Sequence, residues 1–120
     1  MVELHQRAAV SLVLYYAAVG LWGLFLWRRK SPITPGYRGA LVIGVALGVV
    51  QALLGVFLLL QGQRPEDNLH FLYGASVILT LPLVMSYIVD KNVSRPLVFG
   101  LASLFMAGLA IRAITTGGSV

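Results

Sequence analysis

Long runs of apolar residues dominate the chain, and the charged residues gather in the short stretches between them. Each run is close to the ~20 residues that a helix needs to cross the hydrocarbon core of a membrane. No run alternates apolar and polar residues as barrel strands do, and backbone groups in lipid must be satisfied within their own segment, so helices are expected. The pattern predicts four membrane-spanning helices, over residues 8–27, 39–61, 69–89 and 97–114.

The segments between the runs are short. Neighbouring helices should therefore be antiparallel, which predicts an all-α, up-down bundle. No segment is long enough to fold outside the membrane, so residues 1–120 are predicted to form a single four-helix transmembrane domain. The composition agrees, because 58% of the residues are hydrophobic and only 11% are charged. A soluble domain of this size could not bury so much apolar surface.

The basic residues are distributed unevenly between the two sides of the bundle. The first and third connections carry the whole net charge of +5, whereas charges on the other side cancel. The positive-inside rule then makes these two connections cytoplasmic and places both termini and the second connection on the outer side. We expect an integral protein of a prokaryotic plasma membrane. Its positive charge then reflects its orientation in the lipid bilayer and does not indicate nucleic-acid binding. The charges of these connections belong to Arg28, Arg29, Lys30, Arg38, Asp90, Lys91 and Arg95.

The chain contains two histidines, His5 and His70, and no cysteine. Each histidine by itself has an ordinary explanation as a residue at the membrane interface. Together they are more informative, because they lie at the outer ends of the first and third helices. In an up-down bundle these helices are diagonal partners that run in the same direction. Two imidazoles that reach inward would leave space for one metal ion, with metal–nitrogen bonds of about 2 Å.

The ligand set favours one kind of metal site. A bare transition metal usually takes three or four protein ligands, and no further His or Cys is available. A haem supplies four equatorial nitrogens and needs only two axial ligands. His5 and His70 are therefore predicted to be the axial ligands of a bis-histidine, b-type haem near the outer face. The absence of a CxxCH motif predicts that the haem is held non-covalently.

Other residues at the outer end fit a haem. Arg7, Arg64 and Arg112 are all on this side, and guanidinium groups bind carboxylates well, so they are predicted to pair with the haem propionates. Gly74 follows His70 by one helical turn and would leave space for a flat macrocycle.

Two stretches of the sequence resemble one four-helix unit of haem A synthase. The stretch "QALLGVFLLLQGQRPEDNLHFLYGASVILTLPLV" is similar to the second half of that unit, in which a glutamine and a Leu-Gly pair precede an outer loop with proline and a histidine that begins the next helix. The stretch "ELHQRAAVSLVLYYAAVGLWGLFLWRRK" is similar to the opening helix of the unit, which begins with an acid and a His-Arg pair and ends in basic residues.

The resemblance implies roles for particular residues. His5 and His70 would be haem ligands, and Gln51 and Gly55 would be the cofactor-binding glutamine and glycine of the intervening helix. In the family two such units are usually fused, so a chain with one unit would need a homodimer to provide the second. The resemblance also makes Glu3 a candidate for the family's catalytic glutamate.

The chain departs from the family pattern at its start, and this shapes the functional hypotheses. Glu3 stands two residues before His5 rather than three, and Gln6 interrupts the His-Arg pair. We therefore favour a haem-binding membrane protein for electron transfer or haem handling over an enzyme. Two alternatives stay open: a haem-free accessory subunit of a larger respiratory or photosynthetic membrane complex, and a half-size haem A synthase that acts as a homodimer.

Overall fold

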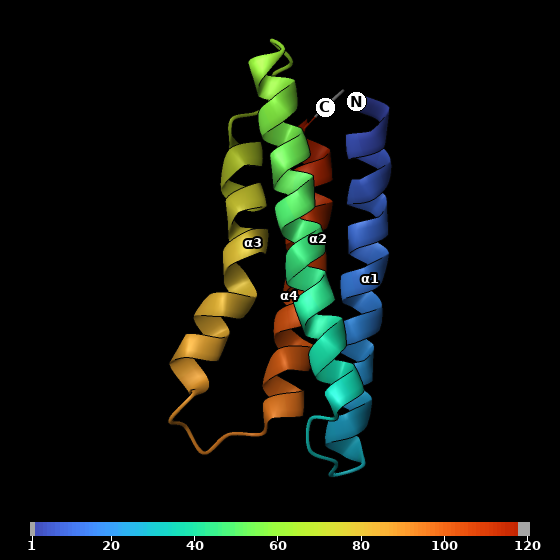
Figure 1. Ribbon diagram of the computed structural model, residues 1–120, viewed down its shortest axis with the longest axis vertical. Coiled ribbons are helices and arrows are strands. Elements are labelled where there is room, and N and C mark those ends of the chain that lie inside the picture. Colours follow the sequence, from blue (N-terminus) through green and yellow to red (C-terminus); the bar gives the residue numbers. More distant parts are fainter. Residues whose placement is uncertain (1, 118–120) are drawn as a thin grey trace.

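The computed structural model describes residues 2–117, and these residues form four helices and no strand (Figure 1). All four helices are long and apolar enough to cross a membrane. The predicted all-helical class with four candidate membrane spans is thus confirmed, and the helices indicate an integral membrane protein. The helices are α1 (Val2–Arg28), α2 (Pro35–Leu60), α3 (Leu69–Ile88) and α4 (Arg95–Gly117).

Three helices extend beyond the predicted apolar spans. α1 begins at Val2 rather than at residue 8, α2 begins at Pro35 rather than at residue 39, and α4 extends over 95–117 rather than 97–114. The apolar pattern marks only the part of a helix that lipid requires, whereas backbone hydrogen bonding continues through polar residues. One consequence is that His5 lies inside α1 and has a fixed direction from the helix axis.

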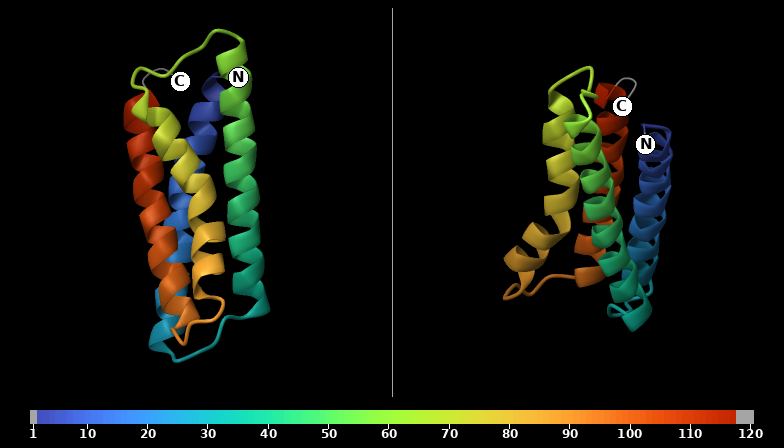
Figure 2. Two further views of the ribbon diagram at one scale, coloured as in Figure 1. Left: turned by 90° about the vertical axis from the view of Figure 1, so that its left-hand side faces the viewer. Right: turned by 45° about the horizontal axis from the view of Figure 1, so that its top comes forward.

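The four helices surround a common centre. α1 packs against α2 and α4, and α3 packs against the same two helices, so α1 and α3 occupy opposite corners (Figure 2). Backbone hydrogen bonds tie the connection before α3 to the end of α4, from Glu66 N–H to the Gly117 carbonyl at 3.2 Å and from Asp67 N–H to the Thr116 carbonyl at 3.0 Å. The start of α1 and the end of α2 lie at this same end of the molecule (Figure 1). We call it the histidine end, because His5 and His70 are both located there.

Glycines allow α1 and α4 to approach closely. A Cβ atom added at Gly23 would lie 2.7 Å from the Cα of Gly100 and 2.9 Å from the carbonyl oxygen of Pro96. One added at Gly20 would lie 3.0 Å from the Gly100 carbonyl oxygen. Helices in lipid associate through such close packing, because lipid offers no hydrophobic driving force between them. The small-residue face of the first helix therefore determines which neighbour it packs against.

α2 turns its glycine face toward α1. Gly44 and Gly48 leave room for the ring of Tyr16, which is 1% exposed. The Tyr16 hydroxyl donates a 2.8 Å hydrogen bond to the Gly44 carbonyl. In the half of the bundle away from the histidine end, the buried hydroxyl of Tyr37 donates to the Val19 carbonyl at 3.2 Å. Each phenol thus links α1 to α2.

Pro82 lies inside α3. Proline has no backbone N–H and its ring clashes with the preceding turn, so a helix bends at this point. Figure 1 shows that α3 changes direction along its length and that its last turns diverge from the other helices. Its straight first half, which begins at Leu69, is the part that forms the histidine end.

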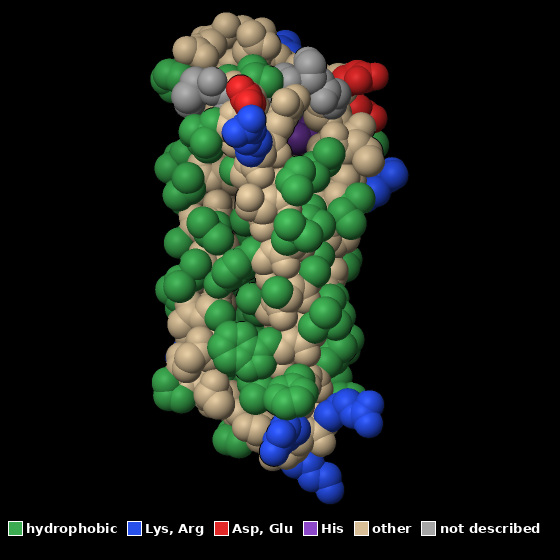
Figure 3. Space-filling model, turned by 90° about the vertical axis from the view of Figure 1, so that its right-hand side faces the viewer, with side chains coloured by type: hydrophobic (Ala, Val, Ile, Leu, Met, Phe, Trp, Pro, Cys, Tyr) green, Lys and Arg blue, Asp and Glu red, His purple; other side chains and the backbone are tan. Residues whose placement is uncertain are grey.

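The outer surface of the bundle is apolar over most of its length. Hydrophobic side chains cover the middle of the face shown in Figure 3, while Lys and Arg side chains lie at one end and charges of both signs at the other. Leu14, Leu53 and Leu83 are each more than 60% exposed. Such a surface is compatible with a lipid bilayer around the helices.

Candidate functional site

His5 and His70 meet at the histidine end. His5 lies near the start of α1 and is 5% exposed, and His70 lies in the first turn of α3. That turn is fixed by Asp67, whose Oδ1 accepts a 2.9 Å hydrogen bond from the Leu69 N–H. The two imidazole rings contact each other edge to face, with their centroids 6.1 Å apart. Two residues from diagonal helices are therefore brought into direct contact.

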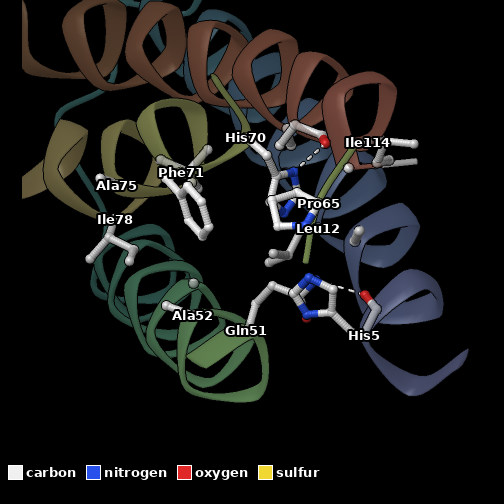
Figure 4. Close-up of a pocket in the computed structure, with 18 of the residues that line it drawn as sticks. His5, Leu12, Gln51, Ala52, Pro65, His70, Phe71, Ala75, Ile78 and Ile114 are labelled. Carbon is white, nitrogen blue, oxygen red and sulfur yellow. Dashed lines mark hydrogen bonds between the residues drawn. The ribbon is translucent and has the colours of Figure 1, made fainter. Parts of the chain in front are cut away.

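The ring of His70 is held by α4. Its Nδ1 lies 2.6 Å from the carbonyl oxygen of Ala113 (Figure 4). A carbonyl can only accept a hydrogen bond, so Nδ1 must carry a proton. In the neutral ring this leaves Nε2 as the unprotonated nitrogen, with its lone pair available to a ligand. Histidines that bind metals are usually oriented in this way, by a hydrogen bond from the other ring nitrogen.

His5 is held differently, through its backbone. The Nε2 of Gln51 donates a 2.7 Å hydrogen bond to the His5 carbonyl oxygen, which joins α2 to the first turns of α1 (Figure 4). This is the interhelical hydrogen bond that a glutamine deep in an apolar span usually forms. Within residues 2–117, the buried Nδ1 of His5 and the buried Oε1 of Gln51 have no hydrogen-bond partner. Two polar atoms at the same place are thus left for something else to satisfy.

Both histidines line a cavity of about 430 Å³, a volume in the range of small-molecule binding sites. No Asp, Glu, Lys or Arg is among the described residues that line it. Val56 of α2 and Phe71 and Ala75 of α3 line the cavity and are also exposed, so it reaches the surface between these two helices (Figure 4). Val10 of α1 and Ile114 of α4 likewise line it and are exposed, so this is not its only approach to the surface among the described residues. Small residues from all four helices form much of the wall: Ala9, Gly48, Ala52, Gly55, Gly74, Ala75, Ala110, Ala113 and Gly117.

Two of these glycines leave space for the imidazole rings. A Cβ atom added at Gly55 would lie 3.3 Å from the Cε1 of His5, and one added at Gly117 would lie 3.0 Å from the Cε1 of His70. Gly55 was expected at the site from the resemblance, whereas Gly117 was not. The sequence could have indicated Gly117 by its spacing from Ala110 and Ala113, because this spacing places the three small residues on one face of α4.

The charged residues expected at the site lie outside the cavity. Arg7 forms an ion pair with Glu3, and both side chains are more than 70% exposed. The guanidinium of Arg112 lies 5.7 Å from the centroid of the Tyr73 ring. Arg64 is exposed on the connection between α2 and α3. The structure therefore brings the histidines, Gln51, Gly55 and Gly74 to one cavity, and it places Glu3 and the three arginines on the surface around it.

The donor set fits a metal that brings ligands of its own. Within the described part of the chain, no group of three or more His, Cys, Asp or Glu side chains could hold a bare ion. Two axial imidazoles that share one iron have their coordinating nitrogens about 4 Å apart, and their ring centroids lie further apart than that. The ring centroids of His5 and His70 lie 6.1 Å apart, which is further than this nitrogen separation, as such an arrangement requires. No protein-family model, curated protein or solved structure matches the chain.

Proposed function

We propose that the protein is an integral membrane haem protein, in which His5 and His70 are the axial ligands of one non-covalently bound b-type haem. The observation that carries the proposal is the contact of the two imidazoles inside an uncharged cavity. A site with two imidazoles and no other metal-binding side chain suits a metal that already has four ligands. The function that follows is electron transfer or the handling of haem within the membrane.

The shape of the cavity supports a flat ligand. Nine of the 23 described residues that line it are glycine or alanine, so backbone and Cβ atoms form part of the wall beside apolar side chains such as Leu12 and Phe71. Its side opening between α2 and α3 lies along the apolar surface of the bundle. A flat and largely apolar group could enter there from the lipid. When bound, such a haem supplies a one-electron redox centre, and the chain itself supplies the two ligands, their orientation and a dry surrounding.

The arginines are proposed to act at the rim of the site. Propionates would have to leave the uncharged cavity, and Arg7, Arg64 and Arg112 surround the histidine end with exposed side chains. Because these guanidinium groups are exposed, they can bind a carboxylate without the cost of burial. Arg7 would exchange its present partner, Glu3, for a propionate.

We propose an up-down bundle with the histidine end on the outer side of a prokaryotic plasma membrane. The basic stretches 28–38 and 90–95, which join α1 to α2 and α3 to α4, then face the cytoplasm. Glu3 lies away from the cavity and pairs with Arg7, so no observation favours the haem A synthase reaction over haem binding alone.

Absorption spectroscopy tests the proposed function directly. Protein purified in mild detergent from a haem-replete host should show a Soret band and, after reduction, a sharp α-band. His5→Ala and His70→Ala should both lose the sharp α-band, because each removes one of two strong-field ligands. Gly108→Ala is the matched control, since an added Cβ there would have no neighbour within 4 Å. A colourless wild-type preparation with full helicity would overturn the proposal and favour a haem-free accessory subunit.

A further inference from the structure

The two histidines are held so differently that they should not be equivalent ligands. We propose that His70 is the permanent axial ligand and that His5 is exchangeable, so that a small neutral ligand can take its place on the metal. This inference rests on the proposed function, because it assigns separate roles to the two ligands of that haem. Such a ligand binds the metal through one atom, as carbon monoxide and free imidazole do.

His70 is fixed by several independent contacts. The Ala113 carbonyl accepts its Nδ1 proton at 2.6 Å. The backbone N–H groups of Glu66 and Asp67 bind the carbonyls of Gly117 and Thr116, which keeps the start of α3 against the end of α4. Rotating the His70 ring away from a metal would break this short and partly buried hydrogen bond. Ala113 therefore acts as a positioning residue through its carbonyl.

His5 lacks a comparable restraint. Gln51 binds the backbone carbonyl of His5 and leaves the ring free to turn about its side-chain bonds. The Nδ1 of His5 is buried and, among residues 2–117, has no hydrogen-bond partner. The ring packs against Gly55 on one side and against the ring of His70 on another. An imidazole held in this way can leave a metal and return to it without disturbing α1.

The cavity also offers room on the side of His5. Small residues of α1 and α2 line it there, among them Ala9, Ala52 and Gly55. The unpartnered Oε1 of Gln51 lies in the same wall and is the one polar side-chain acceptor that the described part of α2 presents near His5. A small ligand that displaces His5 would thus find space, and one with a polar hydrogen would also find an acceptor.

Nuclear magnetic resonance of the histidine ring nitrogens tests the inequivalence without haem. Haem-free protein with 15N-labelled histidine should show His70 as a single tautomer, protonated on Nδ1. His5 should show averaged shifts of more than one state. His5→Ala and His70→Ala provide the assignments. A His70 ring with no preferred tautomer, or a His5 ring as rigid as His70, would overturn the inference.

The haem-loaded protein provides the second test. His5→Ala should retain most of its haem as a high-spin species, bind carbon monoxide after reduction, and regain the low-spin spectrum when imidazole is added. His70→Ala should lose its haem on purification. The wild type should bind carbon monoxide slowly, since His5 must first leave the iron.

Two glycine variants form a matched pair for the same test. Gly117→Ala crowds the ring of His70 and should raise the haem dissociation constant by about 10-fold to 100-fold, the usual effect of disturbing the support of a ligand. Gly55→Ala crowds the ring of His5 and should make carbon monoxide bind faster, with a smaller rise in the haem dissociation constant than Gly117→Ala causes. Equal haem loss in both histidine variants, with a normal wild-type Soret band, would overturn this inference alone. A missing wild-type Soret band would overturn the proposed function itself.

Discussion

The imidazoles of His5 and His70 come from opposite corners of the bundle and meet with their ring centroids 6.1 Å apart. Because the chain has no cysteine, this contact can be tested by chemistry that is independent of haem. The double variant His5→Cys/His70→Cys should form an intramolecular cross-link with a short bifunctional thiol reagent. The product should migrate as a monomer and contain no free thiol.

The control for this experiment is His5→Cys/Tyr87→Cys, since Tyr87 lies near the far end of α3 and its side chain is 73% exposed. In this pair each thiol should react with one arm of a separate reagent molecule, and no cross-link should form between the two cysteines. If the two double variants cross-linked equally well, the arrangement of α1 and α3 at the histidine end would be wrong.

The buried hydroxyl of Tyr16 should make a small and measurable contribution to stability. Tyr16→Phe removes its 2.8 Å hydrogen bond to Gly44 and keeps the ring. The Gly44 carbonyl still accepts a bond within its own helix, so the loss should be about 0.6 kcal/mol, the average for such bonds in lipid. Unfolding in mixed micelles would measure it. A loss several times larger would show that the phenol has a further partner.

Gly23 should be far more sensitive to substitution than its size suggests. A Cβ atom at this position would lie 2.5 Å from the Tyr37 hydroxyl and 2.7 Å from the Cα of Gly100. Because a neighbouring backbone cannot move locally, Gly23→Ala should destabilise the bundle by about 1–3 kcal/mol. Gly108→Ala is the control, since that Cβ has no neighbour within 4 Å. Similar unfolding free energies for the two variants would contradict the close approach of α1 and α4.

The side opening of the cavity should control access to the histidines. Ala75→Trp places a large ring in the wall between α2 and α3, and it should lower haem content at least several-fold without loss of helicity. Leu79→Trp lies one turn further along α3, is 52% exposed and does not line the cavity, so its haem content should stay at the wild-type level. Haem-to-protein ratios from the pyridine haemochrome spectrum provide the measurement. Full haem loading of Ala75→Trp would place the entry elsewhere.

The proposed orientation in the membrane can be tested with single cysteines. Gln61→Cys lies on the connection between α2 and α3, and Asn92→Cys on the connection between α3 and α4. An impermeant maleimide added to intact cells should label Gln61→Cys, and it should label Asn92→Cys only after the cells are permeabilised. The reverse pattern would place the histidine end in the cytoplasm and contradict the positive-inside assignment.

Much of the fold could be predicted because lipid restricts the choices. Apolar runs of sufficient length must be helices, because in lipid the backbone groups have to be satisfied within their own segment. The proximity of His5 and His70 also followed, from the order of the helices in a bundle with short connections. The helix predictions depend on patterns along one segment at a time, and the histidine prediction adds only the order of the segments.

The support of the site could not be predicted in the same way. The group that orients His70 is the backbone carbonyl of Ala113, and a backbone carbonyl has no signature in the sequence. The pairing of Arg7 with Glu3 was likewise missed, although the two residues are spaced by one helical turn. α1 continues through these residues, and the pair lies on its exposed side instead of the side of the cavity.

By itself, the amino-acid sequence determined that this chain forms four apolar helices with two histidines at one end, because helix length, apolar content and short connections depend on local order in the chain. Only the tertiary structure decided that the two imidazoles touch within an uncharged cavity and that α4 holds one of them by a backbone carbonyl. The physical reason is that these features depend on the rotation of each helix about its own axis. That rotation is set by glycine contacts and buried hydrogen bonds between helices, which arise only when all four pack together.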